Sequence, residues 1–292
     1  MTTTLVRRDV ARVVTSPPPA PGFMGEGHTA VPVVEPNDIQ RSDPFILLMD
    51  DRLDLPPGRR AGGPHPHAGF EIVTFVVEGA LRDRDEGLLE AGDVVWMTAG
   101  SGVIHGEDLV PLEKSRILQL WLTLPSSARW VPPRFERIAR DAAPLRREPG
   151  VEARVYSGSS GPARAATHNY VPVTMVDVRL DAGAVFEQEL PGSYNGFVYV
   201  LDGDVIAGGP AQKRLTAGEV GWLADADAAT STSLRLTGAA HGARVAFYAG
   251  ERQGVPLVMH GPFVGETRAD LMRVSQDYVH GRMPRLSELA GR

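Results

Sequence analysis

The chain of 292 residues carries a weak internal repeat with an offset of about 125 residues. Residues 75–79 (FVVEG) are matched by residues 199–203 (YVLDG), and residues 89–97 (LEAGDVVWM) are matched by residues 215–223 (LTAGEVGWL). Both offsets are nearly the same, so the simplest explanation is two copies of one fold in tandem. This restricts the chain to duplicated architectures.

The repeated segments are predicted to be strands. Apolar runs at 72–77, 94–97, 117–122 and 197–201 are rich in β-branched and aromatic residues and are separated by glycine and proline. Many short strands of this kind indicate an all-β fold of sandwiches or barrels. We expect a first domain over 1–130, a linker over 131–160 and a second domain over 161–292. The second domain should end in one short amphipathic helix, because a capping-box pattern starts at Thr267.

The composition excludes several classes of protein. A formal net charge of −6 argues against a basic face that binds nucleic acid directly. The chain has no cysteine, which excludes disulfides, thiolate ligands and thiol nucleophiles. We find no apolar signal-peptide region at the N-terminus and no run near the roughly 18 apolar residues of a membrane helix. We therefore expect a cytoplasmic protein that does not enter a membrane.

Two short segments carry potential metal ligands. The sequences HPH at 65–67 and HGE at 105–107 each place two metal-competent side chains two residues apart. Alternate side chains of a strand point to one face, and Pro66 favours the extended conformation that this requires. If the two segments are neighbours, three imidazoles and a carboxylate converge and can bind a divalent transition metal. The predicted ligands are His65, His67, His105 and Glu107.

The internal repeat provides a control for this prediction. Sliding the first copy onto the second aligns the histidine pair with Glu189 and Pro191, and the pair at 105–107 with Ser231 and Ser233. The second copy therefore repeats the fold without the ligands. That pattern is expected if the first set is a functional site and not a requirement for folding.

The ligand types constrain the metal without identifying it. Three nitrogens and one carboxylate oxygen suit Fe(II), Mn(II), Ni(II), Cu(II) or Zn(II), and we favour Fe(II). Four protein ligands either close a tetrahedral zinc site or leave two positions on a six-coordinate metal. Glu71 competes with Glu107 for the carboxylate position, or it orients a histidine from outside the ligand set. The following large side chains are expected in the core: Trp96, Met97, Trp121 and Trp222.

At this level of detail the sequence resembles the pirin family. The segments that carry the resemblance are 65–71 (HPHAGFE), 92–100 (GDVVWMTAG) with 104–107 (IHGE), 118–121 (LQLW) and 256–264 (PLVMHGPFV). The likeness extends from about residue 45 to residue 280, which is nearly the whole chain. Two positions depart from the family's usual pattern: Ala68 stands where arginine is usual, and Gly106 where serine or alanine is usual.

The resemblance implies a bicupin, in which two β-barrels follow in tandem and the N-terminal barrel binds the metal. Family positions that match the four predicted ligands bind iron or another divalent metal, and the second barrel lacks ligands. Several family members open the heterocyclic ring of quercetin with dioxygen. Others are binding proteins, including a nuclear transcription co-regulator in animals.

We therefore expect a metal-dependent dioxygenase that opens the heterocyclic ring of flavonols such as quercetin. In this hypothesis Glu107 accepts the proton of the substrate's 3-hydroxyl group. The alternative is a non-enzymatic iron-binding redox sensor or co-regulator that acts through a protein partner. Turnover of a flavonol-like small molecule separates the two, because a sensor binds metal without consuming oxygen.

Overall fold

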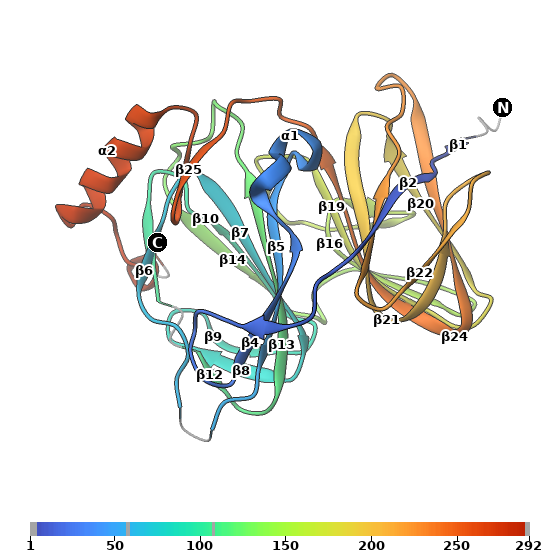
Figure 1. The fold of residues 1–292 in the computed structure, drawn as a ribbon, viewed down its shortest axis with the longest axis horizontal. Coiled ribbons are helices and arrows are strands. Elements are labelled where there is room, and N and C mark those ends of the chain that lie inside the picture. The colour runs from blue at the N-terminus through green and yellow to red at the C-terminus, as the bar shows by residue number, and fades with distance from the viewer. Residues whose placement is uncertain (1–4, 57–58, 107–108, 290–292) are drawn as a thin grey trace. The chain divides into compact units, whose positions relative to one another are not determined.

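A computed structural model describes residues 5–56, 59–106 and 109–289, and it is built mainly of β-strands (Figure 1). The chain divides into two compact units. Unit 1 consists of Met1–Ser16 and Asp141–Arg252, and unit 2 consists of Pro17–Arg140 and Gln253–Arg292. The all-β class predicted from the sequence is confirmed. No helix in the described part of the chain is long and apolar enough to cross a membrane.

Unit 2 contains the predicted ligands. Its main sheet has seven strands in the order β14 (Arg134–Ile138), β10 (Val94–Thr98), β7 (Phe70–Glu78), β13 (Ser115–Thr123), β5 (Phe45–Leu53), β4 (His28–Val34) and β3 (Ala20–Pro21). Smaller sheets join β6 (His65–His67) with β11 (Val103–His105), and β8 (Ala80–Asp83) with both β9 (Gly87–Glu90) and β12 (Val110–Pro111). The remaining elements are η1 (Pro36–Asp38), α1 (Ile39–Ser42), β25 (Val258–His260), β26 (Phe263–Gly265), α2 (Arg268–Val279) and η2 (Leu286–Glu288).

Unit 1 is built on a ten-stranded sheet. Its central path runs β15 (Leu145–Glu148), β16 (Val151–Ser157), β19 (Val173–Leu180), β24 (Ser231–Glu251), β21 (Tyr194–Ala207), β23 (Glu219–Leu223) and β2 (Val10–Thr15). The strands β1 (Val6–Arg7), β20 (Val185–Pro191) and β22 (Lys213–Thr216) join this sheet beside the path, and β17 (Ser159–Ser160) pairs with β18 (Ala163–Arg164).

The two copies of the sequence repeat form equivalent strand pairs. In unit 2, β7 pairs with β10 so that Phe75 lies opposite Val94. In unit 1, β21 pairs with β23 so that Tyr199 lies opposite Val220. These residues occupy matching positions of the repeat, so the two copies share their strand register as well as their sequence pattern.

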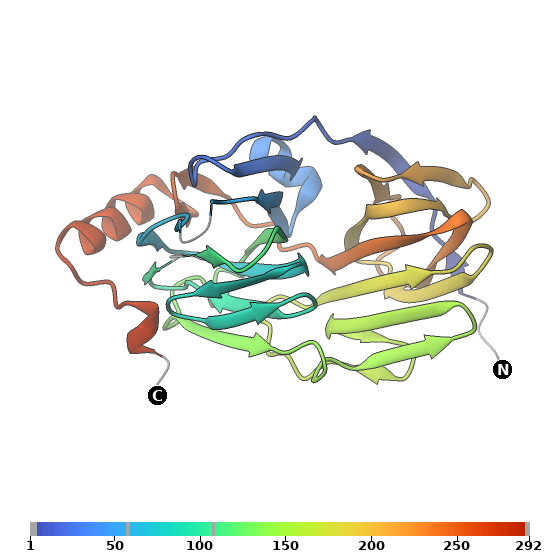
Figure 2. The same cartoon turned by 90° about the horizontal axis from the view of Figure 1, so that it is seen from below.

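The units differ from the continuous domains expected from the sequence. Each end of the chain belongs to the unit that is formed mainly by the other half of the sequence. The N-terminal strand β2, drawn in dark blue, joins the sheet of unit 1 (Figure 2), where it pairs with β23. Val10 of this strand is buried in the apolar core of unit 1. The C-terminal segment 253–292 belongs to unit 2. The expected linker 131–160 also forms regular strands, among them β14 in unit 2 and β16 in unit 1. β2 belongs to unit 1 because it hydrogen-bonds to β23 in the sheet of that unit, although the two strands are far apart in sequence.

The C-terminal helix forms as predicted. Thr267 caps α2: its hydroxyl accepts a hydrogen bond from the backbone N–H of Asp270, whose carboxylate in turn accepts one from the backbone N–H of Thr267. This reciprocal arrangement is a capping box. Val274 is the buried residue of the helix and packs with Phe263 and Met283 against Ala68. The helix therefore lies against the turn that follows the histidine pair.

Candidate metal centre

The two ligand-bearing segments are neighbouring antiparallel strands. In the β6–β11 pair, His65 lies opposite His105, and His67 lies opposite Val103. The extended conformation predicted for residues 65–67 is therefore present, with Pro66 inside a two-stranded sheet. Two residues along a strand return to the same face, so His65 and His67 both point to the place that His105 approaches from the other strand.

The three histidine rings gather at this place. The ring centroids of His65 and His67 are 4.6 Å apart, and those of His65 and His105 are 5.7 Å apart. One ring nitrogen from each of the three residues lies within 4.8 Å of the other two, close enough for one ion to bind all three. The fourth predicted ligand, Glu107, lies outside the described residues. Both groups of three or more potential ligands that the described residues contain are in unit 2.

His65 is held in an orientation suited to metal binding. Its Nδ1 lies 2.7 Å from the carbonyl oxygen of Gly63. A carbonyl only accepts, so Nδ1 carries the proton and donates it. In the neutral ring a proton on Nδ1 makes Nε2 the nitrogen that can bind a metal, which is the usual arrangement of metal-binding histidines.

His67 is kept neutral by its surroundings. Burial, together with the neighbouring imidazoles of His65 and His105, holds the pKa of His67 well below its usual range. Its Nδ1 is buried and has no hydrogen-bond partner among the described residues. A buried neutral imidazole is a competent ligand that does not first have to lose a proton. The nitrogen donors of the site therefore fit a divalent transition metal.

Two aromatic side chains pack edge-on against His67. The ring centroid of His67 is 5.4 Å from that of Phe70 and 5.5 Å from that of Trp121. Trp96, Met97 and Trp222 are buried in the core as predicted. Trp121 is only partly buried: it packs on the core and contacts His67.

Glu71 is not gathered with the histidines. It belongs to β7, where it lies opposite Thr98 of β10 and accepts a hydrogen bond of 2.7 Å from the Thr98 hydroxyl. Burial raises the pKa of Glu71 to about 6, although hydrogen bonds from Thr98 and Trp96 oppose this rise. Neither group of potential metal ligands includes Glu71. Its place in the structure is therefore inside the main sheet.

An acidic turn that the sequence reasoning missed approaches the site. Glu86, between β8 and β9, places its Oε1 3.0 Å from Nε2 of His105. Asp83, Glu86 and His105 form the second group of potential metal ligands. The sequence signal was the acidic run at 83–86 (DRDE), but nothing in the sequence indicated that this turn folds onto β11.

The C-terminal segment forms backbone hydrogen bonds at both ligand-bearing strands, β6 and β11. The carbonyl of Ala68, directly after β6, accepts a hydrogen bond of 2.9 Å from the N–H of Val264. The N–H of Ile104 in β11 donates to the carbonyl of Pro284 at 2.8 Å. Ala68 itself is fully buried against Phe263, Val274 and Met283. A side chain as large as the usual arginine would therefore require a different packing here.

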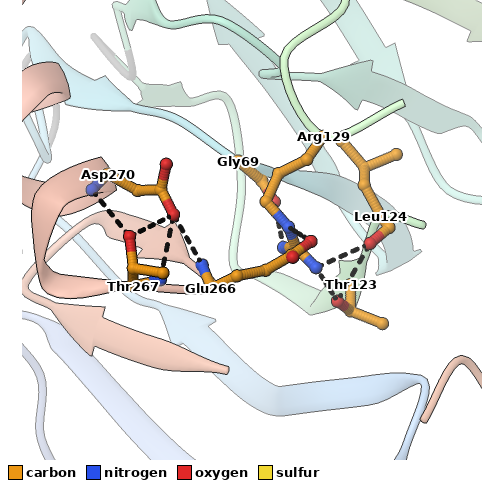
Figure 3. A network of polar contacts seen from close by, with 7 residues as sticks. All are labelled: Gly69, Thr123, Leu124, Arg129, Glu266, Thr267 and Asp270. Atoms are coloured by element: carbon orange, nitrogen blue, oxygen red, sulfur yellow. Dashed lines mark hydrogen bonds and ion pairs between the residues drawn. The ribbon is translucent and has the colours of Figure 1, made fainter. Parts of the chain in front are cut away.

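A buried arginine connects this segment to the turn after the histidines (Figure 3). Arg129 is completely buried and donates to the carbonyls of Gly69 and Leu124, at 3.0 and 2.8 Å. It also donates to a carboxylate oxygen of Glu266 at 3.0 Å. The hydrogen bond from the Ser126 side chain, aided by Arg129, lowers the pKa of Glu266 and keeps it charged.

Unit 1, which contains the second copy of the repeat, lacks this set of ligands. There Pro191 lies opposite Ser231, and Glu189 lies opposite Ser233. The sequence alignment had matched His65 with Glu189 and His105 with Ser231, so the two strands are offset by two residues relative to that alignment. A shift of two residues leaves every side chain on the same face. The conclusion that the second copy carries no histidine at these positions is unchanged.

The fold and the sequence are shared with known proteins. The Pirin family model matches residues 28–122, and the Pirin C-terminal cupin domain model matches residues 175–284. Pirin-like protein 2 of Arabidopsis thaliana is 34% identical over 248 residues, covering 82% of this chain and 75% of the relative. The crystal structure of GK1651 from Geobacillus kaustophilus aligns with a TM-score of 0.78 at 36% identity, covering 87% of this chain and 100% of the other.

A further structural match carries an enzyme name. Quercetin 2,3-dioxygenase from Acinetobacter baumannii aligns with a TM-score of 0.81 at 25% identity, covering 94% of this chain and 98% of the other. The tandem cupin architecture expected from the sequence is thereby confirmed. From its two matching domains and its relatives, the chain belongs to the pirin family.

Proposed function

We propose that this chain is a metal-dependent dioxygenase that opens the heterocyclic ring of flavonols such as quercetin. The observation that carries the proposal is the convergence of His65, His67 and His105 on one point of unit 2. The similarity to quercetin 2,3-dioxygenase from Acinetobacter baumannii supports a small aromatic substrate and an oxidoreductase activity.

In this proposal the three histidines and Glu107 hold the metal, for which we favour Fe(II) over Mn, Ni, Cu or Zn. When bound, the ion supplies Lewis acidity that lowers the pKa of the flavonol's 3-hydroxyl group. Glu107 accepts the proton that leaves this hydroxyl. Trp121, beside His67, offers an aromatic surface on which a flat substrate can lie. Both atoms of dioxygen enter the product, and one ring carbon leaves as carbon monoxide.

The test is oxygen uptake by the protein reconstituted anaerobically with Fe(II) and given quercetin. We expect uptake with an equal amount of carbon monoxide, and loss of both in His105→Ala. His241→Ala, which removes an exposed histidine of unit 1, serves as the matched control and should retain the activity. Tight binding of Fe(II) without uptake would instead favour an iron-binding redox sensor or co-regulator that acts through a protein partner.

The role of Glu107 has a separate test. Glu107→Gln keeps the size of the side chain and removes its basicity. Loss of a general base slows turnover by a factor of about 10² to 10⁴, so the variant should lose at least about a hundredfold in kcat. A normal rate of quercetin turnover in this variant would contradict the proposed role.

A further inference from the structure

The turn between β8 and β9 is built to present a carboxylate to the histidines. One carboxylate oxygen of Asp83, Oδ1, accepts hydrogen bonds from the backbone N–H groups of Asp85 and Glu86, at 2.7 and 2.9 Å. An aspartate that bonds to the backbone two and three residues ahead folds a tight turn. This turn directs the side chain of Glu86, which is only 4% exposed, to His105.

The turn also contains a buried oxygen atom without a partner. Oδ2 of Asp83 is buried and accepts no hydrogen bond within the described residues. Asp83 is 1% exposed and belongs to the same group of potential ligands as Glu86 and His105, all within 4.8 Å of one another. A buried carboxylate with an unsatisfied oxygen is costly unless a cation or a donor is close. A cation bound beside His105, which both groups of potential ligands contain, would lower that cost.

The distance between Glu86 and His105 suits two ligands of one ion. Two donors in neighbouring positions on an octahedral ion, each about 2.1 Å from it, lie about 3 Å apart. The observed separation of Oε1 of Glu86 and Nε2 of His105 is 3.0 Å. The same separation is that of a hydrogen bond, so Glu86 bonds to His105 when no ion is bound and is placed to follow it onto an ion. His105 is the residue that the two groups of potential ligands share.

Gly106 makes room for this turn. A Cβ atom added to Gly106 would lie 2.4 Å from Oδ2 of Asp85, so the carboxylate of Asp85 would have to move away. Position 106 therefore lies against the acidic turn at 83–86, next to His105.

From these observations we propose that Glu86 is a carboxylate ligand of the metal held by His65, His67 and His105, and that Asp83 is the positioning residue that folds its turn. The inference rests on the metal centre in the proposed function. It adds a ligand from a different element of the fold. Glu107 then need not serve as the only carboxylate ligand and is available as the base.

The experiment measures the affinity of the full-length, metal-free protein for Ni(II) by equilibrium dialysis, without substrate. Glu86→Gln should bind Ni(II) at least about tenfold more weakly than the wild type, since loss of a supporting group at a metal site costs about 10- to 100-fold. The matched control is Glu90→Gln, which removes an exposed carboxylate of β9 and should bind as the wild type does. Equal affinities of Glu86→Gln and the wild type would overturn the inference.

A double-mutant cycle tests the coupling to Gly106. Gly106→Ala should weaken Ni(II) binding, and the double variant with Glu86→Gln should bind no more weakly than Glu86→Gln alone. Losses that simply add would show that Gly106 acts independently of the turn and would overturn the coupling. Urea unfolding without metal checks that each variant is folded.

Two further readouts separate the possible failures. The ligand-field spectrum of Co(II)-loaded protein should change in Glu86→Gln if Glu86 is a ligand, and an unchanged spectrum would overturn that assignment. If the wild type and His105→Ala both fail to bind Ni(II), the metal centre itself is refuted together with the proposed function. If only the effect of Glu86 is missing, the proposed function stands and this inference does not.

Discussion

Two glutamates of unit 2 have buried side chains, and their surroundings give them different roles. Glu71 points to Thr98 inside the main sheet, whereas Glu86 contacts His105 at the predicted metal site. Burial raises the pKa of Glu71 to about 6, so at neutral pH this residue carries a charge in a place that disfavours charge. We infer that Glu71 lowers the stability of the unit at neutral pH.

Glu71→Gln should therefore stabilise the metal-free protein at neutral pH. The folded-state pKa of about 6 lies above the unfolded value of 4.5, so the folded state binds more protons between these values and stability falls as pH rises through this window. The loss is nearly complete at pH 7 and amounts to about 2 kcal/mol. Urea unfolding should show Glu71→Gln more stable by up to that amount at pH 7, and by much less at pH 4.

The exposed Glu90→Gln is the matched control and should unfold as the wild type does at both pH values. A gain for Glu71→Gln that is the same at pH 4 and pH 7 would show that the effect does not come from this ionisation. The measurement is made with a chelator present, so that metal binding does not contribute to the difference.

Candidate ligands with the two-residue spacing of a strand could be predicted, and a carboxylate without that spacing could not. The pair His65 and His67 was found because the two-residue period of a strand is visible in three letters of sequence. His105 was found because it repeats that spacing. Glu86 was missed because its approach to His105 depends on a turn that Asp83 folds, and neither residue has ligand spacing in the sequence.

At the scale of elements, the C-terminal segment supports the ligand strands. Val264 next to β6 and Pro284 next to β11 hydrogen-bond to residues adjacent to the histidines, and Arg129 connects Gly69 to Glu266 before α2. Metal ligands need such outer support to keep their geometry. Because these partners come from a distant part of the chain, no local pattern around the histidines could reveal them.

Gly69→Ala should test the contact with β26. Gly69 has a φ of +88°, and an added Cβ would lie 1.9 Å from the carbonyl oxygen of Val264. Gly254→Ala is the matched control, because it has a φ of +61° but no atom within 4 Å of its added Cβ. The control should lose about 1 to 2 kcal/mol from backbone strain alone. Gly69→Ala should lose more and should also bind Ni(II) more weakly, whereas equal losses in the two variants would contradict a tight contact.

Arg129→Met should destabilise the protein by about 2 to 4 kcal/mol, because it leaves the buried carbonyls of Gly69 and Leu124 without their donor. The ion-pair partner Glu266 is partly exposed and contributes less. Arg147→Met removes an exposed arginine paired with Glu152 and should cost no more than about 1 kcal/mol. Urea unfolding of the two variants provides the comparison. If both unfold at the same urea concentration, the buried network is not important for stability.

At the scale of the whole molecule, the repeat predicted two copies of one fold because it lies in the strands that pair within each copy. The exchange of the chain ends was not predicted. The segment 1–16 belongs to the unit formed by 141–252, and 253–292 belongs to the unit that contains the histidines. Short strands such as β2 carry no sequence signal for which sheet edge they join, so their partner is known only from the structure.

The exchange predicts that a change near one end of the chain affects the unit distant in sequence. Val10→Asp places a charge in the core of unit 1. Val274→Asp places a charge on the buried face of α2 in unit 2. By hydrogen–deuterium exchange, Val10→Asp should loosen peptides from 141–252 and leave peptides around the histidines protected. Val274→Asp should loosen peptides around residues 65–69 and weaken Ni(II) binding. Val6→Asp, at an exposed position of β1, should change neither unit. If Val10→Asp instead loosened peptides from 17–140, the N-terminal segment would belong with the first copy, as continuous domains would require.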